Sequence, residues 1–135
     1  MTADGAPPAL HGAVTLEWAD GSYRFRLAVA QLVELQDLCG AGPYAIYLRL
    51  VAHQWRVQDL RETIRLGLIG GGTAPGEALR LVRAYVEARP LLECEPVAAR
   101  ILAAALIGPD LDDEDGEDPD PGKATAPEAG STTAP

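Results

Sequence analysis

The chain has 135 residues, 47% of them hydrophobic, a size that suits one compact domain and excludes large multidomain enzymes. Its formal net charge of −9 disfavours electrostatic binding to nucleic acids. The charge is unevenly placed, because residues 109–135 hold nine acidic residues and one lysine, whereas residues 1–108 are nearly neutral.

The sequence predicts a β-hairpin near its start. Apolar residues alternate with polar or charged ones on both sides of Asp20-Gly21, which is the period of half-buried strands. Asp-Gly readily adopts the positive dihedral angles of a tight turn, so we interpret residues 13–28 as a hairpin with one apolar face and one charged face. Because such a hairpin is unstable alone, the residues that follow must cover its apolar face.

Five short helices are predicted after the hairpin. Helical spacing of apolar residues, with Gly or Pro at the ends, places them at about residues 29–39, 43–54, 57–69, 73–89 and 96–107. We expect Gly40 to end the first helix as a C-cap and Thr73 to cap the fourth. The predicted fold class is therefore α+β, mainly α: an N-terminal β-hairpin followed by about five short helices.

A single domain over residues 12–108 is predicted between two disordered segments, residues 1–11 and 109–135. The second segment lacks aromatic residues and is dominated by Asp, Glu, Pro, Gly, Ala and Thr, so it cannot offset its ordering entropy. We interpret the acidic run at residues 110–120 as a solubilising tail. The alternatives are a mimic of an anionic partner, or a brake on the association of an adhesive surface.

The predicted helix 43–54 carries two apolar strips. The first has the spacing i, i+3, i+4, i+7 and i+11 and consists of Tyr44, Tyr47, Leu48, Val51 and Trp55. The second, on the other side of the helix, consists of Ile46 and Leu50. Either the helix is central and packed on two sides, or one strip is a docking surface for a second copy or another protein. All seven are candidate partner-binding residues, with Tyr44 and Trp55 as the expected anchors.

The glycine-rich segment Gly67-Leu68-Ile69-Gly70-Gly71-Gly72 is similar to a phosphate-binding loop in its composition alone. It lacks the lysine of such loops, and it follows a predicted helix rather than a strand. We therefore interpret it as a connector between helices and expect no bound nucleotide.

Catalytic and metal-binding patterns are not found in the sequence. The serines, Ser22 and Ser131, lie in the predicted turn and tail, so no serine-histidine-acid arrangement can be drawn. His11 and His53 have no cysteine or carboxylate at ligand spacing, and we expect no metal site and no cofactor. The protein is thus predicted not to be an enzyme.

Several features bear on the compartment in which the protein works. Cys39 and Cys94 show neither metal-ligand spacing nor a disulfide-rich pattern, and we expect them to be buried side chains in a reducing compartment, the cytoplasm. The first twelve residues have no positive charge and no apolar run, so we expect no secretory signal. The stretch 97–107 is far shorter than the roughly 20 residues of a membrane-spanning helix, so no membrane span is expected.

Three segments together resemble the gene transfer agent family protein of bacteria, over about residues 12–108. They are the hairpin HGAVTLEWADGSYRFRL, the helix LAVAQLVELQDLCGAG, and DLRETIRLGLIGGG with the APGEALRLV that follows it. The most distinctive part is the motif formed by Gly67, Leu68, Gly70, Gly71 and Gly72. That family looks like a member of the phage tail assembly chaperone superfamily, and it has also been labelled a tail tube protein.

The resemblance implies a cytoplasmic, non-enzymatic protein of a prophage or gene transfer agent cluster in a bacterial host. Its implied role is to keep the tape-measure protein soluble while tail tube subunits assemble around it, so the implied partners are these two proteins. We expect several copies, as a homo-oligomer, to coat a helical client through helix 43–54. The alternative is a structural tail tube or connector component of the particle, although one hairpin offers little of the sheet that tube proteins need.

Overall fold

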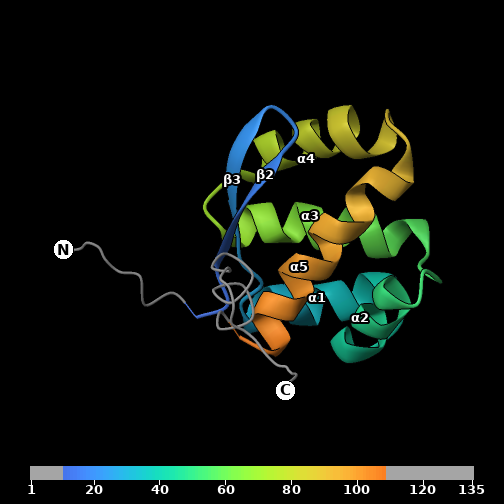
Figure 1. Cartoon of the computed structure of the whole chain (residues 1–135). Helices are drawn as coiled ribbons and strands as arrows, with labels where there is room; N and C mark the ends of the chain where they lie inside the picture. The colour runs from blue at the N-terminus through green and yellow to red at the C-terminus, as the bar shows by residue number, and fades with distance from the viewer. Residues whose placement is uncertain (1–10, 109–135) are drawn as a thin grey trace, which may run out of the picture.

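The structure is a computed structural model, and it describes residues 11–108. In chain order its elements are the strands β2 (Val14–Trp18) and β3 (Gly21–Phe25) and the helices α1 (Val29–Cys39), α2 (Pro43–Val51), α3 (Val57–Gly70), α4 (Pro75–Val82) and α5 (Glu95–Leu106) (Figure 1). A π-helical turn (Arg83–Glu87) and a 3-10 turn (Leu91–Cys94) join α4 to α5. The fold class predicted from the sequence is confirmed. The predicted arm and acidic tail lie outside the described residues, except for His11.

The hairpin turns at Ala19 and Asp20, one residue earlier than expected. Trp18 pairs with Gly21 in the antiparallel register, so Gly21 already belongs to β3, and Ala19 takes the positive φ of 57°. The predicted apolar face is present, because β2 alternates strictly between buried and exposed residues. The Trp18 ring lies edge-on to Phe25, with ring centroids 5.9 Å apart.

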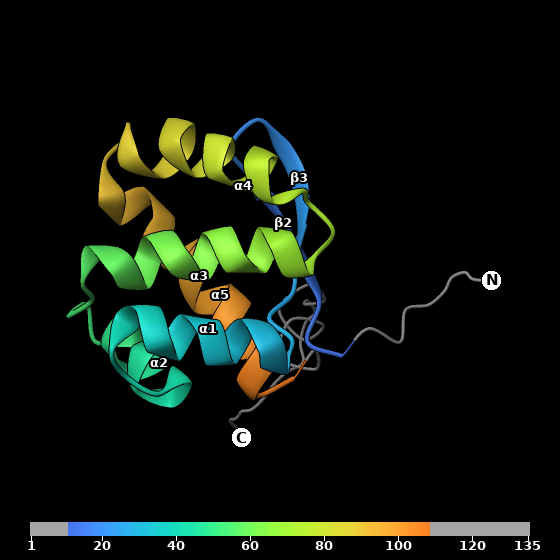
Figure 2. The same ribbon diagram turned by 180° about the vertical axis from the view of Figure 1, so that it is seen from behind.

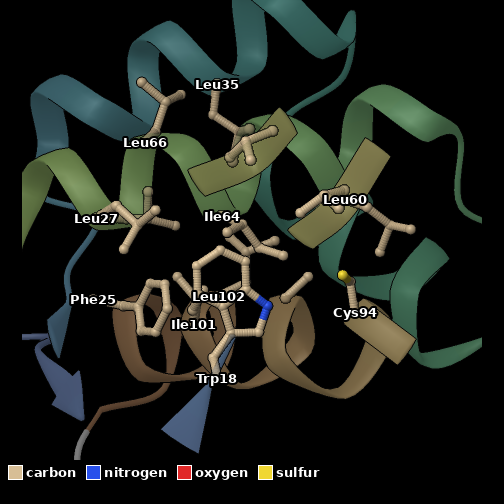
Figure 3. Packing of buried hydrophobic residues seen from close by; sticks show 14 of the residues in the cluster. Trp18, Phe25, Leu27, Leu35, Leu60, Ile64, Leu66, Cys94, Ile101 and Leu102 are labelled. Atoms are coloured by element: carbon tan, nitrogen blue, oxygen red, sulfur yellow. The ribbon is translucent and has the colours of Figure 1, made fainter. Parts of the chain in front are cut away.

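Helix α3 is the central element of the domain. It contacts α1 on one side and α4 on the other, and α5 and the hairpin strand β3 also pack against it (Figures 1 and 2). The core fills the space between these elements, where Trp18, Phe25 and Ile101 lie close to the side chains of α3 (Figure 3). Helix α2 lies at the edge of this arrangement, against α5 and α1.

Glycines allow the C-terminal end of α3 to lie directly on the backbone of β3. The backbone N–H of Arg26 donates to the carbonyl oxygen of Gly67 at 2.9 Å. A Cβ atom on Gly70 would overlap the carbonyl oxygen of Arg26, and one on Gly71 would overlap that of Arg24. The glycine-rich motif is thus a close helix–strand contact that leads into α4, and its Leu68 is fully buried while its last glycine, Gly72, adopts a φ of 116°.

Helix boundaries agree with the prediction for α1, which ends at the left-handed C-cap Gly40 with a φ of 67°. Three details differ. Helix α2 ends at Val51 rather than at residue 54, and Ala74, not Thr73, is the N-cap of α4. The fourth predicted helix is regular only to Val82 and then widens into the π-turn, which apolar spacing does not reveal.

The two ends of the described domain meet beside α5. A Cβ atom added to Gly12 would lie 3.4 Å from the Cα of Ala105, and the guanidinium of Arg26 donates from Nε to the His11 carbonyl oxygen at 2.9 Å. The chain therefore enters the hairpin next to the point where it leaves α5 (Figure 1).

Candidate partner-binding surface

An exposed apolar strip on α2 is the candidate functional site. Tyr44, Leu48 and Val51 are 63%, 45% and 47% exposed. Tyr47 is half-buried, and its ring stacks on that of Tyr44 with centroids 6.3 Å apart. These four residues, here called the α2 strip, form a continuous apolar ridge on the solvent side of the helix. Contiguous exposed apolar area of this kind marks interaction sites.

The second strip of α2 faces the core. Ile46 is 0% and Leu50 is 1% exposed, and both belong to the hydrophobic cluster of the domain. The partner-binding role predicted for these two residues is corrected, because their side chains cannot reach a partner of the folded protein. The helix is therefore not packed on both sides. The strip of Ile46 and Leu50 is buried, and the α2 strip is exposed.

A buried carboxylate fixes α2 to the start of α3. Asp59 is fully buried, and Nη1 of Arg49 on α2 donates to its two oxygens at 3.1 and 3.2 Å. The backbone N–H of Arg56 donates to Oδ2 of the same carboxylate at 2.8 Å, which caps α3. A buried charge is tolerated only when paired and hydrogen-bonded, as Asp59 is.

A second carboxylate fixes the loop between α2 and α3 to the start of α5. Nδ1 of His53, which lies beyond the end of α2, and Nε1 of Trp55 are both 2.7 Å from Oε2 of Glu95. These hydrogen bonds, with that of His53 the larger influence, lower the pKa of Glu95 below its ordinary value of 4.5. Trp55 is half-buried and packs against the hydrophobic core, and its indole N–H donates to Glu95 inside the domain.

The sequence did not reveal the roles of Asp59 and Glu95. Asp59 lies ten residues from Arg49, and Glu95 lies 42 and 40 residues from His53 and Trp55. A short-range signal did exist for Asp59, since an acidic residue at the third position of a helix is a known capping pattern. No local pattern connects Glu95 to its two donors.

The two thiols are inert by position. Cys39 and Cys94 are buried, as expected, and burial raises the pKa of Cys39 to about 12 and also raises the pKa of Cys94. A thiol must ionise to act as a nucleophile, which these environments oppose at neutral pH. Within residues 11–108, no group of three or more His, Cys, Asp or Glu side chains could hold a metal ion. Nor does that part of the chain contain a helix long and apolar enough to span a bilayer.

Comparison with known proteins places the whole described domain in one family. A sequence model described as "Phage tail tube protein, GTA-gp10" matches residues 11–108, from the hairpin to the end of α5. No curated protein and no solved structure matches the chain. Because the match covers well over half of the chain, the protein belongs to this GTA-gp10 family of phage and gene transfer agent tail proteins.

Proposed function

We propose that this protein is a non-enzymatic tail assembly chaperone that binds the tape-measure protein in the bacterial cytoplasm and keeps it soluble during tail assembly. The observation that supports this proposal is the α2 strip, an apolar ridge that the folded domain leaves exposed. The membership in a tail protein family supplies the setting.

The α2 strip has the chemistry of a helix-docking surface. Its members, Tyr44, Tyr47, Leu48 and Val51, are uncharged and repeat with the period of a helix, which suits an amphipathic helix as the partner. The one charged side chain of α2, Arg49, points away from the strip to Asp59. The nine residues of α2 extend over about 14 Å, so a single contact is weak, and several copies along one long client would bind together by avidity.

Co-expression with the tape-measure protein tests the proposal. The variant Leu48→Asp places a charge in the α2 strip, and it should fold normally because Leu48 is 45% exposed. We expect it to leave the client insoluble. The matched control is Leu79→Asp, which charges a 38% exposed leucine on α4, outside the strip. Equal client solubility with the parent and with Leu48→Asp would overturn the proposal.

The second candidate function is a structural one, as a tail tube or connector component of the particle. The description of the matching family, a phage tail tube protein, favours it. Against it, residues 11–108 contain only one two-stranded sheet, whereas tubes are generally assembled from extensive sheet. Mass spectrometry of purified particles separates the two functions, since a stoichiometric amount of this chain is expected only for a structural component.

A further inference from the structure

A pocket of about 340 Å³ lies between the hairpin turn and the segment that joins α4 to α5. Its walls include Trp18 at the end of β2, Tyr85 of the π-turn and Val97 of α5, and Glu17, Arg89 and Glu93 also line it. It shares no residue with the α2 strip. Its binding properties are therefore independent of the function proposed above.

Irregular backbone surrounds this pocket on two sides. Ala19, which lines it, has a left-handed φ of 57°, a conformation that is unfavourable for a non-glycine residue. Tyr85 is carried by the π-turn, a rare element that is frequent at functional sites. The rings of Trp18 and Tyr85 lie edge to face at the pocket, with centroids 6.0 Å apart at 65°; Tyr85 is half-buried, and Trp18 is 9% exposed.

The charged side chains at the pocket leave it with an excess of negative charge. Two carboxylates, Glu17 and Glu93, line it against one guanidinium, that of Arg89. Arg89 is already engaged, because its Nε donates to Glu93 at 3.0 Å. Glu17 accepts a hydrogen bond from the neutral hydroxyl of Ser22. A cationic ligand would thus meet the carboxylate of Glu17 beside the aromatic walls.

We propose that this pocket binds an arginine side chain presented by a partner protein. A planar guanidinium stacks on aromatic rings and pairs with carboxylates, and the apolar walls of Trp18, Tyr85 and Val97 suit the aliphatic stem of arginine. The volume lies near the lower end of the range for small-molecule sites, roughly 300–1,000 Å³, which suits one long side chain.

Two-dimensional NMR of the full chain tests this proposal directly, because the protein has two tryptophans and hence two indole N–H signals. The probe is Nα-acetyl-arginine methylamide, and its neutral isostere, Nα-acetyl-citrulline methylamide, is the ligand control. We expect the arginine derivative to shift the Trp18 signal saturably in the millimolar range, as befits so small a ligand. The Trp55 signal, assigned with Trp55→Phe, should stay in place because that indole donates to Glu95 outside the pocket.

A pair of glutamate variants localises the binding. Glu17→Gln should weaken the arginine derivative about fivefold, the effect of roughly 1 kcal/mol for a partly exposed ion pair. Glu34→Gln on α1 changes the net charge equally but lies outside the pocket, and it should leave the affinity unchanged. An unmoved Trp18 signal, equal binding of the citrulline derivative, or equal weakening by the two variants would each overturn the proposal.

Discussion

Gly70 shows how one missing methyl group determines the packing of this domain. In Gly70→Ala the new Cβ would collide with the Arg26 carbonyl oxygen, a backbone atom that cannot rotate away. We expect a loss of about 2–3 kcal/mol in the free energy of unfolding, since overpacking outweighs the gain in helix propensity. Urea denaturation followed by circular dichroism measures this difference.

The matched control for that substitution is Gly76→Ala in the first turn of α4. A Cβ atom there would have no heavy atom within 4 Å. The change should be neutral or should stabilise the protein by up to about 1 kcal/mol, because alanine loses less backbone entropy on folding. Equal effects of the two substitutions would contradict the close contact between α3 and β3.

Glu95 gives the protein a predictable acid dependence. Its folded pKa is lowered below 4.5, so its contribution to stability is complete above pH 4.5 and is lost as the pH falls through the folded pKa. We expect Glu95→Gln to be less stable than the parent above pH 4.5, and the difference to shrink in more acidic solution. Urea unfolding followed by tryptophan fluorescence between pH 3 and pH 7 measures it. A difference that does not vary with pH would contradict this role.

At the scale of the element, α2 has one face buried in the core and one face exposed to solvent. Leu50→Ala removes a buried side chain and should cost about 2–4 kcal/mol, whereas Leu48→Ala removes a half-exposed one and should cost less than about 1 kcal/mol. The two free energies of unfolding, measured by urea denaturation, form the comparison. Similar losses from both variants would show that the α2 strip is covered by the protein itself.

This helix also shows how far the sequence predicts the elements and where it stops. Periodicity identified both apolar strips of α2, but it could not say which one faces inward. The strip with more residues is the exposed one, whereas Ile46 and Leu50 lie in the core, on a helix that the Arg49–Asp59 ion pair joins to α3. That ion pair depends on where α3 lies relative to α2, which no local pattern encodes.

How well the other elements could be predicted depended on whether the signals that determine their bounds are local in the sequence. The bounds of α1 followed from its apolar spacing and from Gly40, since both signals are local. The hairpin was predicted with its correct faces, but its turn was displaced by one residue because strand register, not the preference of Asp-Gly, places Ala19 in the left-handed region. The pocket beside Tyr85 was not foreseen, because a π-turn has no compositional signal.

At the scale of the whole molecule, the folded domain and the rest of the chain differ in charge. Residues 11–108 contain ten acidic residues and ten arginines, so the net charge of −9 arises almost wholly from residues 109–135. A neutral domain with an exposed apolar strip tends to associate, and the like charges of the remaining residues oppose this by repulsion between copies.

Salt should therefore promote self-association of the full chain. Raising the salt concentration from about 0.01 M to about 1 M shortens the screening length from roughly 30 Å to 3 Å, which weakens the repulsion but not the apolar contact. We expect sedimentation velocity at pH 7 to show larger species at high salt for the parent, and fewer for Leu48→Asp. Salt-independent sedimentation of the parent would contradict this balance of forces.

The contact between Gly12 and the last turns of α5 has a consequence for protein engineering. Because the chain enters the domain at Gly12 beside Ala105 in the last turn of α5, the domain is suited to insertion into a surface loop of a recipient protein. By the same geometry, a circular permutant with a short bridge at this junction and new termini between α1 and α2 should keep the core contacts made by the helices and strands of the parent.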